Sequence, residues 1–208
     1  GAGIFISNNN AAAGAPGCTM GIPGSATDII SITNNRIAGF SLATRIGTNA
    51  IIFAINGPTP ASRSRANVNI SNNGTIANPI SNVGGNTISM SVFGNTDAVA
   101  VVNNNILSPN NSVGSQGIGG GIGRTINTSD TPNLDITVNN NTISNTDGNG
   151  ILMVAREASG TFDLTIKNNN VAKPLGGIRP GIRVDAGGAS GLDDAVCLDI
   201  SGNTSEGS

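Results

Sequence analysis

One asparagine recurs six times at the same place in a short phrase, and this repeat restricts the fold more than any other feature of the chain. The phrase is apolar, any, apolar, any, polar, Asn, any, apolar. Four copies run from Ile30 to Ile37, Val99 to Ile106, Ile136 to Ile143 and Leu164 to Val171. Imperfect copies are Val68 to Ile76, with one extra residue, and Leu198 to Ser205. The fixed residues, 28 to 38 positions apart, are Asn35, Asn73, Asn104, Asn141, Asn169 and Asn203. A strand-forming repeat of this length predicts a solenoid.

A second phrase falls between successive copies of the first. It is a glycine and an isoleucine followed by alternating apolar residues. Its best examples begin at Gly3-Ile4, Gly121-Ile122, Gly150-Ile151 and Gly181-Ile182. Each coil therefore offers this strand, the strand that ends at the asparagine, and a short third strand. Three strands per coil predict a right-handed parallel β-helix.

Side-chain alternation predicts the core of this solenoid. Residues two apart on a strand share a face, so one pair of aliphatic residues per coil should point inward. These pairs are Ile30/Ile32, Val68/Ile70, Val99/Val101, Ile136/Val138, Leu164/Ile166 and Leu198/Ile200. The bend that follows suits asparagine, which tolerates left-handed backbone and whose amide both donates and accepts hydrogen bonds. Stacked in successive coils, the six asparagines should form a buried ladder.

The composition agrees with a thin all-β core. The 208 residues include 30 Gly and 5 Phe but no Trp, Tyr or His, and only 11% are charged. Aliphatic residues fill a core one coil wide without the aromatic residues that a globular core uses. No apolar run is long enough to cross a membrane. We expect one domain, residues 1–208, of about six coils.

The Gly-Ile-x-Val phrase and the phrase Leu-Thr-Ile-x-Asn-Asn-x-Val resemble the repeats of the pectate-lyase-like superfamily of right-handed parallel β-helices. The closest likeness is to the Asn- and Gly-rich repeat regions of large secreted or surface proteins of bacteria. The resemblance covers Gly3 to Thr204 and implies an extracellular or cell-surface location. It leaves the function open, because lyases, glycoside hydrolases, phage tailspikes, adhesins and inert spacers share this fold.

The residues expected to point outward show no catalytic cluster. The lyase branch implies acidic residues that bind calcium, and the tightest acidic group here is Asp185 with Asp193 and Asp194, a weak calcium candidate. Without histidine, neither a Ser-His or Cys-His nucleophile pair nor a conventional zinc site is available. The basic residues form no stripe interleaved with aromatics, which disfavours nucleic-acid binding. We therefore expect no enzymatic activity and no cofactor; the alternative is a β-helix that binds or cleaves carbohydrate.

The ends of the chain predict assembly. We expect no capping segment before the first strand or after the last asparagine turn, and so expect open edges at Ile4 and Ile6 and at Leu198 and Ile200. If a second copy followed Ser208, its Ile4 would lie 30 residues beyond Ile182, which matches the internal repeat. We expect a structural stalk, surface or filament-forming module. Its partner would be itself, as a head-to-tail homopolymer or as part of a longer solenoid, with surface polysaccharide as the other candidate partner.

The two cysteines lie at opposite ends of the predicted solenoid. Cys18 falls in the first coil and Cys197 in the last, roughly 24 Å apart along the axis at the common strand spacing. A disulfide joins Cα atoms about 5.5 Å apart, so the two cannot pair within one chain. Either they remain free thiols or they form a disulfide between stacked copies.

Overall fold

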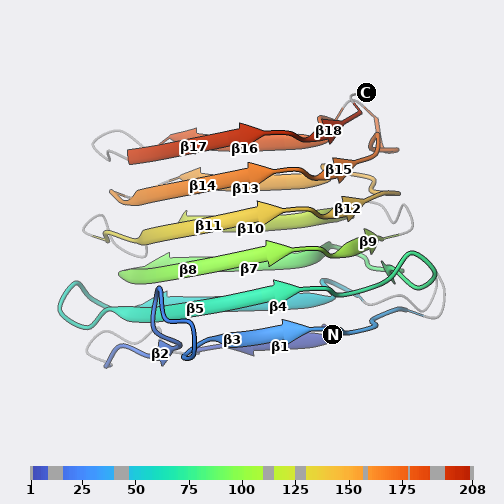
Figure 1. Ribbon diagram of the computed structural model, residues 1–208. Coiled ribbons are helices and arrows are strands. Elements are labelled where there is room, and N and C mark those ends of the chain that lie inside the picture. The colour runs from blue at the N-terminus through green and yellow to red at the C-terminus, as the bar shows by residue number, and fades with distance from the viewer. Residues whose placement is uncertain are drawn as a thin grey trace.

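The computed structural model describes residues 2–8, 16–39, 47–109, 115–124, 130–156, 159–177, 179–187 and 195–206. These residues form a parallel β-solenoid whose coils stack in chain order from one end to the other (Figure 1). Every secondary-structure element in these described residues is a β-strand. The predicted all-β parallel solenoid is thus confirmed.

The first sheet has six strands in the order β1-β4-β7-β10-β13-β16, all parallel. Each strand is one coil further along the chain than the one before it. Their bounds are Ile4–Ser7 (β1), Ile51–Gly57 (β4), Asn86–Gly94 (β7), Gln116–Arg124 (β10), Ile151–Arg156 (β13) and Ile182–Gly187 (β16).

The second sheet has seven strands, because the first coil contributes two short ones that both pair with β5. The remaining order is β5-β8-β11-β14-β17. The bounds are Thr19–Met20 (β2), Ile30–Thr33 (β3), Ser64–Ser71 (β5), Thr96–Asn103 (β8), Asn133–Asn139 (β11), Thr161–Lys167 (β14) and Ala195–Ser201 (β17).

The third sheet has five strands, in the order β18-β15-β12-β9-β6. In the described residues of the first coil, an isolated bridge from Ala38 to Ser81 takes the place of a strand. Complete three-strand coils are therefore slightly fewer than the six expected. The bounds are Ile80–Ser81 (β6), Ile106–Ser108 (β9), Thr142–Ile143 (β12), Asn170–Val171 (β15) and Thr204–Ser205 (β18).

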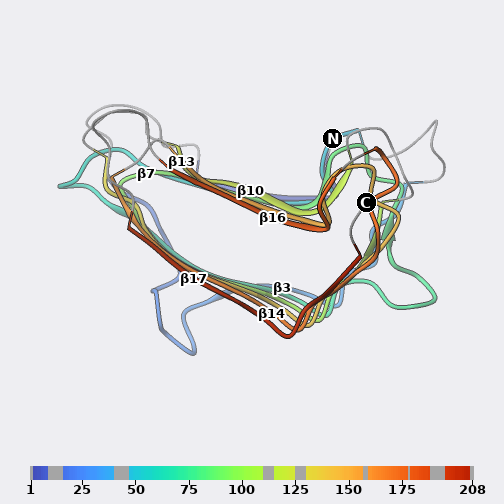
Figure 2. The ribbon, with the colours of Figure 1, turned by 90° about the horizontal axis from the view of Figure 1, so that it is seen from above.

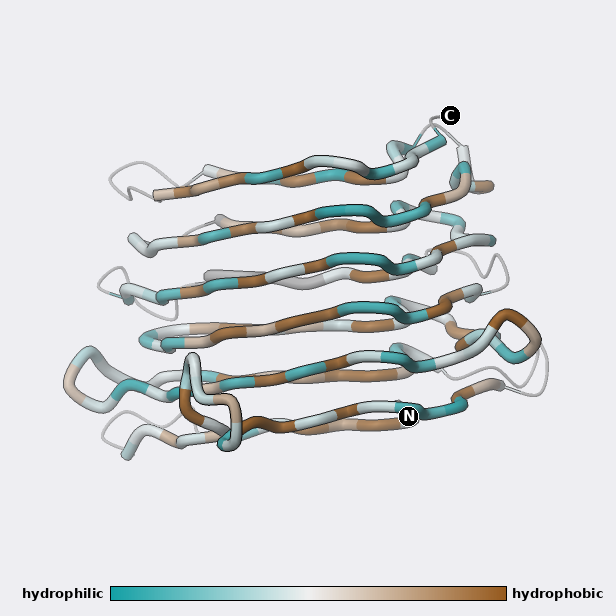
Figure 3. Tube along the Cα trace, in the orientation of Figure 1, coloured by the Kyte–Doolittle hydropathy of each residue, from teal (hydrophilic) through white to brown (hydrophobic). Residues whose placement is uncertain are grey.

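The core is a set of aliphatic columns that run along the axis. In the first sheet Ile51, Ile88, Ile118 and Ile151 are in register and fully buried. Viewed along the axis, the coils superpose around this narrow interior (Figure 2). Apolar and polar residues alternate along the strands, as the period of two requires (Figure 3). Burial of these columns is the main favourable term for the fold.

The corner after each strand of the second sheet has one left-handed residue per coil. A positive φ there suits asparagine or glycine, which pay little for it. These residues are Asn34, Asn72, Asn104, Asn140, Asn168 and Gly202, with φ between 52° and 66°. The asparagine after each of them points into the solenoid. The first residue of each pair thus supplies the left-handed backbone of the bend, and the second supplies an inward amide.

The third coil lies one residue away from the predicted register. Ala100 and Val102 are buried at 3% and 0% exposure, whereas Val99 and Val101 alternate with them on the outer face. The segment from Val99 to Val102 is apolar throughout, so alternation alone does not choose a face. Pairing with β5 fixes it, because Val68 and Ile70 lie opposite Ala100 and Val102. The predicted inward pair Val99/Val101 is therefore wrong.

Two further predicted positions shift for similar reasons. Ile118, preceded by Gly117, lies opposite both Ile88 and Ile151, so the Gly-Ile phrase of this coil begins at Gly117 and not at Gly121-Ile122. In the imperfect copy from Val68, Ile76 is 89% exposed, and Ile80 fills the buried position in register with Leu107. Residues 75–79 form a turn that leaves the coil, since Thr75 and Asn78 bond each other.

Candidate functional site

The asparagine ladder is present, and it joins successive coils through a repeated pair of bonds. The backbone N–H of Asn73 donates to Oδ1 of Asn105 at 3.0 Å, and Nδ2 of Asn73 donates to the same oxygen at 2.9 Å. The same pair of bonds links the remaining steps. The members are Asn35, Asn73, Asn105, Asn141, Asn169 and Asn203.

Asn104 is not a member of the ladder, which corrects the prediction for this coil. Asn104 has φ 53° and is exposed, while Asn105 is fully buried. Three consecutive asparagines, Asn103 to Asn105, follow the shifted apolar segment, so the error in the strand register carried into the corner. The other five predicted members are correct.

From Asn73 onward, each ladder amide also donates to a strand carbonyl of the preceding coil. Nδ2 of Asn141 donates to the carbonyl of Val102 at 2.9 Å, and Nδ2 of Asn169 donates to that of Val138 at 3.0 Å. The side chains of the middle members are 0% to 1% exposed. The ladder thereby gives hydrogen-bond partners to polar groups at the corner. Each of these groups would cost about 1–3 kcal/mol of folding stability if it were buried without a partner.

The two end coils differ in how far they bury their aliphatic residues. Leu198 and Ile200 occupy inward positions in register with Leu164 and Ile166, yet each is 47% exposed. At the other end Ile4 and Ile6 are half-buried and packed against the core. The C-terminal coil is the more open of the two predicted assembly edges.

The backbone of β17 also points half of its groups away from the solenoid. The N–H of Ala195 donates to the carbonyl of Gly160, and the carbonyl of Ser201 accepts from the N–H of Asn168. In a parallel strand alternate residues direct both groups to the same neighbour. Leu198 and Ile200 therefore direct their N–H and C=O away from β14, toward the open end.

The cysteines are free, and the register places them in different columns. Cys18 immediately precedes the Thr19–Arg65 pair, so its column is that of Ser64, whereas Cys197 lies in the column of Asp163 and Asn67. Three residues along a strand span about 10 Å. Cys197 is exposed on the outer face, while Cys18 is half-buried. Stacking copies in register would therefore not bring the two sulfur atoms within disulfide reach.

The weak calcium candidate is only partly within the described residues. Asp185 on β16 forms an ion pair with Arg183, with Nη2 and Oδ2 2.8 Å apart. Asp193 and Asp194 lie outside the described residues. The described part of the chain contains no group of three or more acidic, cysteine or histidine residues placed to hold a metal ion.

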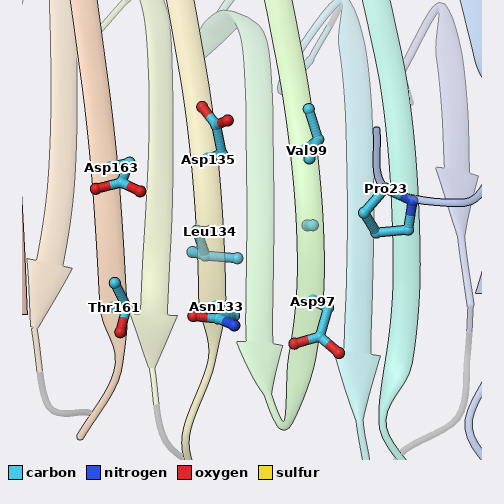
Figure 4. Close-up of a pocket in the computed structure, with 9 residues that line it drawn as sticks. Pro23, Asp97, Val99, Asn133, Leu134, Asp135, Thr161 and Asp163 are labelled. Carbon is cyan, nitrogen blue, oxygen red and sulfur yellow. The ribbon is translucent and has the colours of Figure 1, made fainter. Parts of the chain in front are cut away.

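A shallow depression of about 220 Å³ on the outer face of the second sheet was not predicted. Figure 4 shows Asp97, Asp135 and Asp163 on three successive strands of this face. Arg63 neutralises Asp97, since its Nη2 lies 2.6 Å from Oδ1. Asp135 and Asp163 lie directly opposite each other in register, and both are exposed. The complete lining is Pro23, Asp97, Ala98, Val99, Asn133, Leu134, Asp135, Thr161 and Asp163.

The sequence contained a signal for this depression. Leu134 and Phe162 are buried, so the alternating pattern extends two residues ahead of Ile136 and Leu164. Extending each strand by one period places Asp135 and Asp163 on the outer face.

The loop between β2 and β3 closes one side of the depression with Pro23. It is fastened by Asn67, whose Nδ2 lies 2.9 Å from the carbonyl of Ile22, 2.7 Å from that of Ser25 and 3.2 Å from that of Asp28. Asn67 is 4% exposed although it belongs to the outer face of β5. Its burial follows from the loop that covers it.

No family model, no curated protein and no solved structure matches this chain. Within the described ranges no helix is long and apolar enough to span a membrane. The fold and the geometry of the end coils are therefore the basis for a functional proposal.

Proposed function

We propose that this chain is an extracellular structural β-solenoid that assembles end to end through its terminal coils. One observation carries the proposal: Leu198 and Ile200 continue buried aliphatic columns and yet are each 47% exposed. Their strand also directs backbone donors and acceptors outward along the axis. An open sheet edge with an apolar flank favours the addition of another strand.

The role that fits such assembly is a stalk, a surface layer or a filament, including the shaft of an adhesin. Support for a cell-surface or secreted location comes from the repeat phrases, which resemble the Asn- and Gly-rich β-helix repeats of large secreted bacterial proteins. Each coil adds about 4.8 Å along the axis, so stacked coils make a long, thin particle from a short chain. A protein of this kind holds other parts at a distance and requires no catalytic group.

Sedimentation velocity over a wide concentration range, followed by electron microscopy, tests the proposal. We expect species that grow with concentration and thin fibres one solenoid wide. Reducing agent should leave the fibres intact, because the register keeps Cys18 and Cys197 apart. A chain that stays monomeric at the highest concentration would remove the support for self-assembly.

A second candidate function is carbohydrate binding or cleavage, and the depression on the second sheet favours it. Asp135 and Asp163 present two carboxylates on adjacent strands, flanked by Asn133 and Thr161. Such groups can accept and donate hydrogen bonds to sugar hydroxyls. Titration with neutral and acidic polysaccharides, with and without calcium, tests this function. Binding or turnover that Asp135→Asn and Asp163→Asn both abolish would promote it over the structural role.

A further inference from the structure

The asparagine ladder has a direction. At every step the coil nearer the N-terminus donates and the next coil accepts: the N–H and Nδ2 of Asn35 donate to Oδ1 of Asn73 at 3.0 and 2.9 Å. The last step repeats this arrangement, since the N–H and Nδ2 of Asn169 donate to Oδ1 of Asn203 at 2.8 and 2.9 Å. The two ends of the ladder are therefore chemically different.

Asn203 ends the ladder with donors. Its Oδ1 accepts from Asn169, and its Nδ2 donates to the carbonyl of Ile166 at 2.8 Å. Among the described residues its backbone N–H has no acceptor and its Nδ2 has no further Oδ1 to bond. Asn35 ends the ladder with an acceptor, because its Oδ1 has no donor in the described part of the chain. Both side chains are half-buried.

Among the residues that the structure describes, the open edges of β3 at the N-terminal end and β17 at the C-terminal end both present unpaired backbone groups along the axis, so they can pair with each other. The N–H of Asn34 donates to the carbonyl of Ser71, so alternation along β3 directs the N–H and C=O of Ser31 and Thr33 away from β5. Ile200 directs its own N–H and C=O away from β14. One unbroken column of inward aliphatic residues leads from Ile32 to Ile200.

We infer that the partner of the C-terminal coil is the N-terminal coil of a second copy, and that the ladder continues across the junction. The N–H and Nδ2 of Asn203 donate to Oδ1 of Asn35 in the next copy, and Nδ2 of that Asn35 donates to the carbonyl of Ile200. The N–H of Ile200 donates to the carbonyl of Ser31. This inference rests on the proposed end-to-end assembly and adds its polarity.

The other two ways of joining ends are unfavourable for the same reason. Two C-terminal coils face to face place the amide donors of Asn203 against each other. Two N-terminal coils oppose the Oδ1 atoms of Asn35. Either arrangement leaves polar groups at a covered junction without partners, which is the costly outcome for a hydrogen-bonding group. A head-to-tail contact is heterologous and does not close, so growth continues from both ends of a fibre.

A pair of proline variants tests the polarity. Ile200→Pro removes an N–H that points out of the C-terminal edge, and Ser31→Pro removes one that points out of the N-terminal edge. Proline is tolerated on an edge strand when its missing N–H faces outward, so each chain keeps its own hydrogen bonds. Circular dichroism and thermal melting of each variant confirm that it folds. By sedimentation velocity each variant alone should be monomeric, and an equimolar mixture should give a one-to-one dimer.

A second measurement asks whether the ladder itself crosses the junction. In the mixture, the backbone N–H of Asn203 in ¹⁵N-labelled Ser31→Pro should exchange with solvent more slowly than in that variant alone. Adding Asn203→Asp to Ser31→Pro keeps the acceptor for Asn169 but removes the side-chain donor, and should weaken the dimer about tenfold or more. The matched control adds Asn203→Asp to Ile200→Pro instead, where the C-terminal coil lies outside the mixed junction, and should leave the affinity of the dimer unchanged.

The outcomes separate this inference from the proposed function. If the mixture forms no dimer and the natural chain stays monomeric, end-to-end assembly itself is wrong. If either proline variant dimerises alone, assembly stands but its head-to-tail polarity is overturned. If the mixed dimer forms without slower exchange at Asn203, and Asn203→Asp has the same effect in either proline variant, then the ladder does not continue across the junction.

Discussion

Oδ1 of Asn141 accepts two hydrogen bonds from Asn105 in the preceding coil, one from the backbone N–H at 3.0 Å and one from Nδ2 at 2.9 Å. One side-chain oxygen thus serves both donors of Asn105. It takes the place of a strand carbonyl for the backbone N–H and the place of water for the buried amide. Every ladder position after Asn35 should therefore be sensitive to loss of its side-chain oxygen.

Replacing Asn105 with alanine should lower the free energy of unfolding by about 2–4 kcal/mol, because both donors of Asn73 lose their acceptor. Asn104→Gly is the matched control in the adjacent residue. Its left-handed φ of 53° suits glycine, so its effect should stay within about 0.5 kcal/mol. Urea denaturation of the two variants measures both values. If Asn104→Gly lowered the free energy of unfolding more than Asn105→Ala, then Asn104 and not Asn105 would be the ladder residue of this coil.

Asn67→Ala should release the loop between β2 and β3 while leaving β5 folded. Three carbonyls of that loop lie within 3.2 Å of one amide nitrogen, and no alanine atom can replace it. Hydrogen exchange across residues 21–29 should accelerate, and limited proteolysis should cut there first. Asn69→Ala, two residues along the same outer face, is the control and should leave the loop protected. Equal protection in both variants would show that Asn67 does not hold the loop.

The Asp199 carboxyl should have a pKa below its ordinary 3.8, because it accepts a hydrogen bond from Lys167 on the neighbouring strand and lies close to that charge. A depressed carboxyl pKa stabilises the fold above the ordinary value, and this contribution is lost as the pH falls through the lowered pKa. Both groups are well exposed, so the effect on stability is small.

Carboxyl ¹³C titration by NMR measures this pKa directly. Lys167→Met should raise it, whereas Lys173→Met, which removes a lysine from the same coil, should not. A pKa of Asp199 that is unchanged by Lys167→Met would show that the ion pair does not persist in solution.

Asp163→Asn should stabilise the protein modestly, by about 0.2–1 kcal/mol at neutral pH and low salt, because Asp163 lies directly opposite Asp135. Asp97→Asn should do the opposite, since it breaks the ion pair with Arg63. Thermal melting in low salt compares the two variants, and the gain from Asp163→Asn should shrink in 1 M salt. A loss of stability for Asp163→Asn would indicate that the two carboxylates share a bound cation.

The sequence predicts this fold well because its determinants are local. A period of two along the strand is readable in every coil except the third, an asparagine follows the strand in all six coils, and stacking repeats both features. The register predicted for the third coil was wrong because the segment from Val99 to Val102 is apolar on both faces and is followed by three asparagines. There the register is set by the partner strand, β5, and neighbouring coils were the only source of that information.

The outer face was harder to predict, since it depends on the full length of strands whose starts are polar. Asp135 and Asp163 precede the repeated phrase, so they were outside the pattern that identified the strands. The contact of Asn67 with the loop between β2 and β3 joins residues about 40 positions apart and carries no local signal. Ion pairs such as Arg63 with Asp97 likewise become visible only when the register is known.

The placement of the N- and C-termini at opposite ends of the stack has a mechanical consequence (Figure 1). The hydrogen bonds between coils lie along the axis, so a pulling force on the two ends acts along these bonds and concentrates at the outermost coil. That coil would peel away before the next one bears the force. Each event would free one repeat, between 28 and 38 residues of chain, or about 100 to 130 Å of contour length at the extended reach of a polypeptide. In an optical trap the protein should therefore lengthen in a staircase of unequal steps that follows the spacing of its ladder asparagines.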